Sequence, residues 1–232
     1  MARIYVPATS PDDWQRFLKD PAKHWRMGYS ARTLAHSWHN AIDWPAEVQQ
    51  LFADGPELSL RDTKPLLIIP EKITPVAGTG EPPHSDVFVL AKAADGQLVS
   101  ITVEGKVDEP FGNGNQTVSA WKNEGNVANR RVRLDHLLDK IQLVESRADA
   151  VAYQLIQRTA SAVIEAETYN ARYAVMLVHS FSPEHANFSA FETLASAYGQ
   201  RIHSGQLVEV SSYRDIRLFI GWAQGDPIYL SM

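Results

Sequence analysis

Cysteine is absent from the 232 residues of the chain. The protein therefore has no disulfide, no thiolate metal site and no cysteine nucleophile. Long apolar runs are missing too: residues 174–178 form one of the longest, far below the roughly 20 residues that a membrane helix needs. No apolar stretch typical of a secretory signal follows Met1. We therefore expect a cytoplasmic protein that has no contact with a membrane.

An excess of positive charge is also lacking, because 22 Lys and Arg stand against 27 Asp and Glu. The net charge of −5 argues against a protein that coats nucleic acid regardless of sequence, since phosphate binding relies on Lys and Arg. A local basic groove stays open as an alternative. The densest basic cluster is Arg130, Arg131 and Arg133, and the simpler interpretation of it is the solvated start of a helix.

The hydrophobic content of 44% is enough for a core, and no repeat or long linker divides the chain. We expect a single domain over residues 1–232, with a helical N-terminal part at 1–57 and a core at 58–232. Ser10 followed by Pro11 predicts a helix start, and Ser30 predicts a second one. Asp43 with Pro45 predicts a third helix, which ends before residue 55.

The core alternates between strand and helix patterns. Residues 66–69 predict a short strand between Pro65 and Pro70, and residues 71–85 predict a loop rich in Gly and Pro. A hairpin around residues 94–96 follows, then a loop at 111–117 and a long helix at 150–169. A buried strand at 172–181, a helix at 187–199 and two closing strands complete the chain. This order predicts an α/β fold with a mixed central sheet flanked by helices.

The register of the hairpin decides what the strands bring together. A two-residue turn on Asp95 and Gly96 places Val87 opposite Glu104, which mismatches the apolar faces. A three-residue loop at 94–96 gives one wholly apolar face, with Val87 opposite Val103. Because a buried face fixes strand register, we predict the three-residue loop.

In this register Asp86 lies opposite Glu104, and Lys106 shares the face of Glu104. Two carboxylates at cross-strand distance repel each other unless a proton or a cation lies between them. Mg²⁺ prefers such oxygen ligands, and the main-chain carbonyl of Gly105 could supply another. On this interpretation Glu104→Gln relieves repulsion and does not lower stability. The simpler alternative is a surface ion pair between Glu104 and Lys106, which leaves Asp86 unexplained.

Asp86 followed by Glu104-Gly105-Lys106 resembles the PD-(D/E)xK signature of the restriction-endonuclease-like nuclease superfamily, except that His84 and Ser85 precede the Asp in place of Pro. The predicted order of helix, three strands, helix and strand also resembles the core of that superfamily. The resemblance implies that Asp86, Glu104 and Lys106 are catalytic, and that Asp86, Glu104 and Gly105 bind Mg²⁺ or Mn²⁺. A metal-activated water would then attack a phosphodiester bond.

Two further positions come from the same resemblance. It implies an acid on the first core helix, for which Glu47 is the candidate, and a catalytic Gln on the long helix, for which Gln154 is the candidate. Gln154 and Arg158 are four residues apart and share a helix face, and a solvated face is the alternative. The pair His36 and His39 could bind zinc, but the sequence offers no third ligand at a sensible spacing.

Most of the chain also resembles a family of uncharacterised bacterial proteins, through EGKV with a following EPFG, the segment QLIQRTASAVIEA, MLVHSFSP and a terminal GW. The function expected is a metal-dependent nuclease acting on nucleic acid, with DNA favoured. Because many nucleases of this superfamily pair to cut both strands, a homodimer is among the expected assemblies. The alternative is a catalytically silent binding or scaffold module that keeps the fold.

Overall fold

The computed structural model describes residues 8–232; the first seven residues of the predicted N-terminal part lie outside this range. A six-stranded sheet with the order β1-β2-β3-β4-β6-β5 forms its centre. Strands β1, β2 and β3 form an antiparallel meander, β3, β4 and β6 run parallel, and β5 is antiparallel to β6. The predicted α/β fold with a mixed sheet is confirmed. The strands are β1 (Lys64–Ile73), β2 (His84–Lys92), β3 (Leu98–Lys106), β4 (Tyr173–Ser180), β5 (Leu207–Tyr213) and β6 (Ile216–Gln224).

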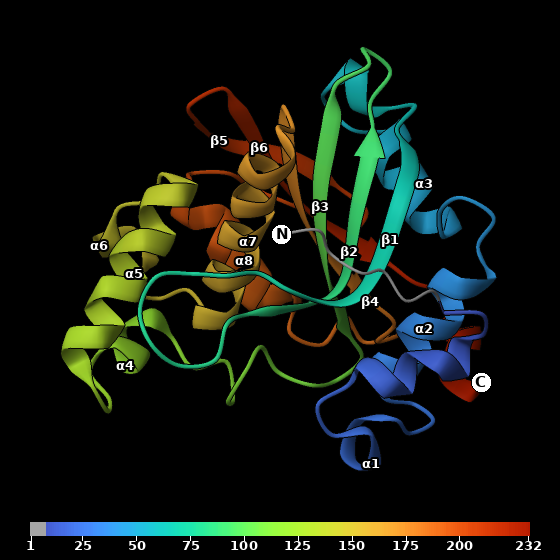
Figure 1. Cartoon of the computed structure of the whole chain (residues 1–232), viewed down its shortest axis with the longest axis horizontal. Coiled ribbons are helices and arrows are strands. Elements are labelled where there is room, and N and C mark those ends of the chain that lie inside the picture. The colour runs from blue at the N-terminus through green and yellow to red at the C-terminus, as the bar shows by residue number, and fades with distance from the viewer. Residues whose placement is uncertain (1–7) are drawn as a thin grey trace.

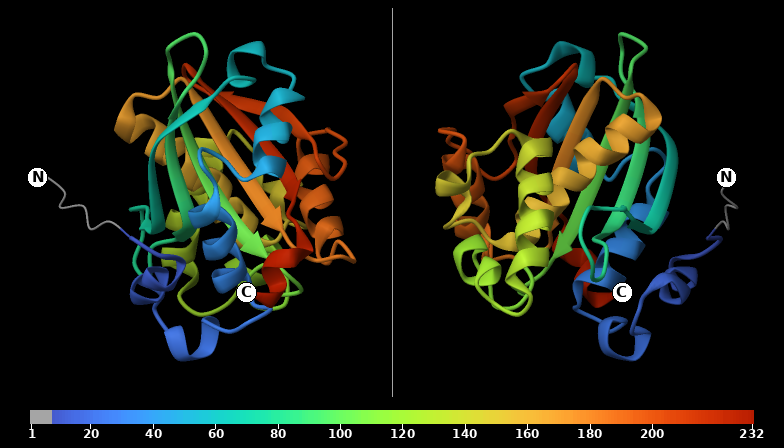
Figure 2. Two further views of the ribbon diagram at one scale, coloured as in Figure 1. Left: turned by 90° about the vertical axis from the view of Figure 1, so that its right-hand side faces the viewer. Right: turned by 60° about the vertical axis from the view of Figure 1, so that its left-hand side comes forward.

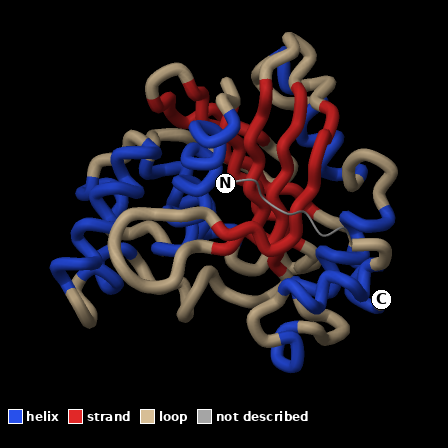
Figure 3. The backbone as a smooth tube through the Cα atoms, viewed as in Figure 1, coloured by secondary structure: helices blue, strands red, loops and turns tan. Residues whose placement is uncertain are grey.

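Helices cover both faces of the sheet (Figures 1, 2 and 3). One face carries α4 (Val118–Lys122), α5 (Val127–Ile141), α6 (Glu145–Ala148), α7 (Tyr153–Tyr169) and α8 (Phe188–Ala197). The other face carries α2 (Ser30–Asn40) and α3 (Ala46–Ala53), with α1 (Pro21–His24) and the 3₁₀ turns η1 (Pro11–Phe17), η2 (Leu58–Leu60) and η3 (Pro227–Ser231) in the same half of the fold. A separate apolar cluster fills each side of the sheet. The sheet is therefore buried between two helical layers.

The N-terminal helices differ in detail from their predicted form. The segment after Ser10 is a 3₁₀ helix with Pro11 in its first turn, rather than an α-helix. Ser30 is the first residue of α2 and not its cap, because Tyr29 occupies the cap position. The amide of Ser30 instead donates to the Glu109 carboxylate at 2.9 Å, so a partner from beyond β3 caps this helix. The third helix begins after Pro45, as expected.

Strand β1 is longer than the predicted strand at residues 66–69, because it continues through both Pro65 and Pro70. It is an edge strand with only β2 beside it, and an edge strand tolerates residues that cannot donate to the ladder. Glu71, expected in a loop, therefore lies inside the strand, with a left-handed φ of 50°. This left-handed conformation occurs opposite Asp86, one of the predicted site residues.

The hairpin between β2 and β3 has the predicted three-residue loop. Ala93 donates to the Gln97 carbonyl at 2.9 Å, and Val87 pairs with Val103. Both valines are fully buried in the cluster beneath α2 and α3. Gly96, the last loop residue, has a φ of 84°, which suits glycine. Matching of apolar faces therefore set the register.

Gly96→Ala should lower the free energy of unfolding by about 1 kcal/mol, because a Cβ is unfavourable at this φ. Urea unfolding would measure the change. Gln97→Ala, an exposed neighbour outside the left-handed position, should stay within about 0.5 kcal/mol of wild type. Equal stability of the two variants would contradict the role given to the loop conformation.

Candidate active site

Most of the residues singled out from the sequence meet where β2 begins and β3 ends. Asp86, Glu104, Gly105, Lys106 and Gln154 all line one cavity of about 400 Å³, which we call the carboxylate cavity. The last paired residues of the hairpin at this end are Val87 and Val103, so Asp86 and Glu104 follow as the next opposed positions. Strand register thus explains why the acids meet.

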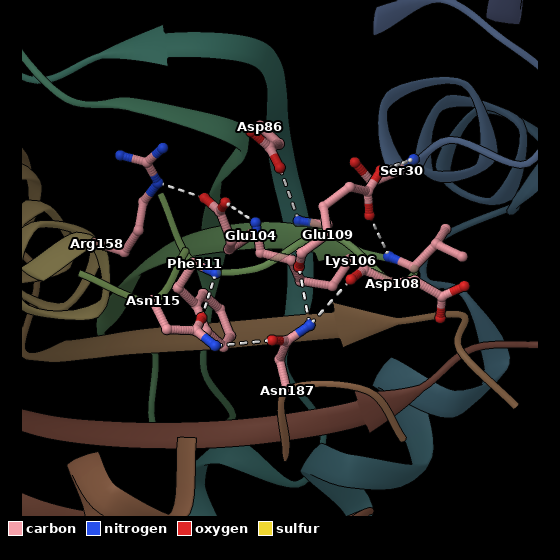
Figure 4. A network of polar contacts seen from close by, with 12 residues as sticks. Ser30, Asp86, Glu104, Lys106, Asp108, Glu109, Phe111, Asn115, Arg158 and Asn187 are labelled. Carbon is pink, nitrogen blue, oxygen red and sulfur yellow. Dashed lines mark hydrogen bonds and ion pairs between the residues drawn. The ribbon is translucent and has the colours of Figure 1, made fainter. Parts of the chain in front are cut away.

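Asp86 is half-buried, and its Oδ2 accepts a hydrogen bond of 2.8 Å from the amide of Gly105 (Figure 4). Glycine at this position leaves room for α2, since an added Cβ would lie 2.9 Å from Leu34 Cδ2. We expected Gly105 to offer its carbonyl to a metal ion. In the structure, Gly105 instead contacts Asp86 through its N–H.

Glu104 is only 2% exposed and is held by two cations. Lys106 Nζ lies 2.8 Å from Oε1, and Arg158 Nε donates to Oε2. The ion pair considered from the sequence therefore exists, but it is buried and has a third member from α7. Burial would raise the pKa of Glu104, but Arg158 and Lys106 outweigh it and hold this pKa below its usual value.

A third carboxylate, Glu71 on β1, lines the same cavity and was missed from the sequence. It lies between the pairs Pro70–Val87 and Lys72–Ser85, which places it opposite Asp86. Burial, followed by the charge of Asp86, raises the pKa of Glu71 to about 9. Burial, followed by the charge of Glu104, raises the pKa of Asp86 to about 7. Three acids thus form a row across three neighbouring strands.

The row of Glu71, Asp86 and Glu104 offers the oxygen ligands that a hard cation prefers, but the three carboxylates do not surround a common point. Across residues 8–232 no three His, Asp or Glu side chains are grouped closely enough to hold a metal ion. Both oxygens of Glu104 are bound to Lys106 and Arg158, whereas Asp86 and Glu71 have less compensation. Mg²⁺ keeps several waters and needs only one or two carboxylates. Asp86 and Glu71 fit that requirement.

Glu47 is not part of this site, which corrects the expectation for an acid on the first core helix. Its Oε1 lies 2.6 Å from His179 Nε2, and Trp38 Nε1 donates to His179 Nδ1 at 3.0 Å. Trp38 belongs to the apolar cluster beneath α2 and α3, on one face of the sheet. Glu104 is bound by Arg158 of α7, which covers the other face. Because Nδ1 accepts from Trp38, the neutral imidazole carries its proton on Nε2 and donates it to Glu47.

The rim of the cavity is held by a hydrogen-bond network around Glu109 and Asn187 (Figure 4). The Glu109 carboxylate accepts from the amides of Val107 and Ser30, which joins the end of β3 to the start of α2. Asn187 donates to the carbonyls of Asp108 and Glu109 and accepts from Asn115. Three distant segments thus fix the chain after Lys106.

Comparison with known proteins identifies a family. The model of a domain of unknown function, DUF6946, matches residues 7–227. The chain belongs to this family. No curated protein and no solved structure matches it. Within the described part of the chain, none of the helices has the length and apolar character to span a membrane.

Glu104→Gln should lower the free energy of unfolding by about 3 kcal/mol, because it leaves Lys106 and Arg158 buried without their shared carboxylate. This reverses the expectation from the sequence, which considered repulsion between acids and not the second cation. Chemical unfolding would measure the loss, with Glu192→Gln on the exposed side of α8 as the matched control. Wild-type stability of Glu104→Gln would contradict the ion-pair arrangement.

Asp86→Asn should raise the melting temperature at pH 8 by roughly 2–4 °C, the shift that about 1 kcal/mol gives for a chain of this length. The raised pKa of Asp86, about 7, means that the folded state retains a proton that the unfolded state has lost. The wild type therefore loses stability as the pH rises from about 4 to 7, and the variant should not share this loss.

Melting curves in EDTA between pH 5 and pH 8 would check this dependence on pH. The advantage of Asp86→Asn should shrink toward pH 5, and Asp139→Asn, an exposed aspartate on α5, should follow the wild type throughout. An advantage that is the same at both pH values would argue against a protonated Asp86.

Proposed function

We propose that this protein is a metal-dependent nuclease that hydrolyses phosphodiester bonds of nucleic acid, with DNA as the favoured substrate. The observation that carries the proposal is the convergence of Asp86, Glu104, Lys106 and Gln154 on one cavity. These are the positions that match the signature of the restriction-endonuclease-like superfamily. Their meeting depends on contacts between β2, β3 and α7, which the signature alone does not guarantee.

The element order supports the same proposal. Helix α3 precedes the meander β1-β2-β3, and after the inserted helices α4, α5 and α6 the helix α7 leads to β4, which is parallel to β3. This is the order of helix, three strands, helix and strand that the resemblance implies. The signature acids lie at the ends of the second and third strands, as the resemblance requires.

Each residue has a role that follows from its surroundings. Asp86 and Glu71 would hold Mg²⁺ or Mn²⁺, which supplies charge stabilisation for the phosphate and an acidified water. Lys106 would orient a water or move a proton with its ammonium group once that group leaves Glu104 for the substrate. Gln154 lines the same cavity, and its amide would position the phosphate. Arg158 fixes Glu104 and would add positive charge near a bound phosphate.

One observation favours the alternative of a catalytically silent binding module. Glu104 has both oxygens engaged by Lys106 and Arg158, so in this arrangement it is not available as a metal ligand. The net charge of −5 points in the same direction, because nonspecific phosphate binding needs basic surface. A binding module would keep the cavity and its rim but would not turn over substrate.

Cleavage assays separate the two functions. Purified wild type should cut single-stranded or plasmid DNA with Mg²⁺ or Mn²⁺ but not in EDTA. Asp86→Asn and Lys106→Met should each lose roughly 100-fold or more of this activity, because each removes a group that acts on the reacting atoms. Glu192→Gln, purified in the same way, should retain full activity. Equal residual cleavage by all four proteins would identify a contaminant and favour the binding module.

A further inference from the structure

A second cavity lies next to the carboxylate cavity and shares its wall. Its volume is about 520 Å³, within the range of small-molecule sites, and we call it the amide cavity. Lys19, Gly112 and Gln154 line both cavities. A molecule bound with its phosphate at the carboxylates could therefore extend past Gln154 into the amide cavity.

The lining of the amide cavity combines aromatic rings with neutral amides. The rings of Trp121 and Tyr153 stack at 3.6 Å and form one apolar wall. Gln154 and Gln157 contribute amide groups, and Gln116 contributes a third whose NH2 donates to Glu124. An amide offers a donor and an acceptor together, which is the pattern on the edges of nucleobases. This wall suits a planar ligand with mixed polar edges.

Gln154 has an unused acceptor at the boundary between the cavities. Its Oε1 is buried and has no hydrogen-bond partner among residues 8–232. A buried polar atom without a partner is unfavourable, and a ligand that donates a hydrogen bond would satisfy it. Exocyclic amino groups of bases are such donors. Gln154 lines both cavities, so rotation of its side chain would present this oxygen to a ligand there.

The charge of the amide cavity favours an anion. Arg133 lines it and donates to the main-chain carbonyls of Ala77, Gly80 and Glu81, and within the described residues it forms no ion pair. The Glu81 carboxylate, which also lines the cavity, is paired with Lys19. The positive charge of Arg133 is thus not cancelled by a carboxylate, which suits the sugar–phosphate chain of a nucleotide.

We propose that the amide cavity binds the base and sugar of the nucleotide that flanks the scissile phosphate, so that the substrate is recognised as a single strand with this base unstacked. This inference rests on the proposed nuclease function, because it takes the phosphate to lie at the carboxylates. A cavity of this size accepts one nucleotide and not a base pair held in a duplex. Preference for one strand then follows from the shape of the site.

The test measures binding in EDTA, where no metal-dependent cleavage interferes. The probe is a fluorescein-labelled single-stranded DNA of ten nucleotides, with a series in which each position in turn is abasic. Wild type should bind the intact strand about tenfold more tightly than one abasic member of the series, and more tightly than the matching duplex. Gln157→Ala should lose about tenfold toward the intact strand, and Gln50→Ala, on an exposed position of α3, should lose nothing.

A combined measurement identifies the base that the cavity holds. Gln157→Ala should discriminate less than the wild type between the intact strand and that one abasic strand, because the missing base has already removed the contact of Gln157. If the affinity lost through Gln157→Ala and the affinity lost through the missing base added up at every abasic position, the proposed subsite would be wrong. Wild-type affinity of Gln157→Ala for the intact strand would also overturn it. Unchanged folding of Gln157→Ala is checked by its melting temperature.

The outcomes for the two proposals differ. Cleavage with Mg²⁺ together with wild-type binding by Gln157→Ala rejects the subsite and leaves the nuclease in place. The predicted binding pattern without metal-dependent cleavage supports the subsite and rejects the nuclease, which leaves a single-strand binding module.

Discussion

The ion-pair cluster of Glu104 with Lys106 and Arg158 is the interaction on which the arrangement of the site depends. A lone carboxylate at this depth would be strongly unfavourable, so its burial requires compensation. Lys106 comes from the same strand, but Arg158 comes from α7, which reaches the sheet only through tertiary packing. Together with the buried ion pair between Lys72 and Glu165, this pairing therefore fixes the rotation of α7 on the sheet. Because Gln154 lies one turn earlier, the same contact brings it to the cavity.

The row of acids is compensated unevenly. Glu104 has a cation on each oxygen, Asp86 has a main-chain N–H from Gly105, and Glu71 lies 3.8 Å from His84, whose pKa burial lowers. Asp86 and Glu71 are therefore the less compensated acids, and burial together with the charge of the neighbouring carboxylate raises the pKa of each. The left-handed φ of Glu71 is a strained conformation of the kind that clusters at functional sites. A proton or a divalent cation would relieve the same repulsion.

Those parts of the site that depend on strand alternation could be predicted from the sequence, and those that depend on tertiary contacts could not. Apolar matching of Val87 with Val103 gave the register, and with it the approach of Asp86 to Glu104. Pro70 predicted the end of a strand, so Glu71 was assigned to the following loop. The strand continues through Pro70 because it lies at the edge of the sheet, and the sequence does not tell which strand lies at an edge. Arg158 was noted only as a helix-face neighbour of Gln154. Glu47 lies on the expected helix but contacts His179. The order of elements along the chain does not decide toward which face of the sheet a helix residue points.

The two functions considered for the protein differ in what Lys106 does. While Lys106 is bound to Glu104, it neutralises an acid and is not available to a substrate. Arg158 alone can hold Glu104 through Oε2, because Lys106 uses the other oxygen. Lys106 can therefore leave Oε1 without stranding a buried charge, and Oε1 then becomes free as a ligand beside Asp86. A purely structural ion pair needs only one cation on Glu104. A second cation is required if Lys106 is to leave Glu104 when a metal ion and a phosphate bind, because Arg158 then still neutralises the carboxylate.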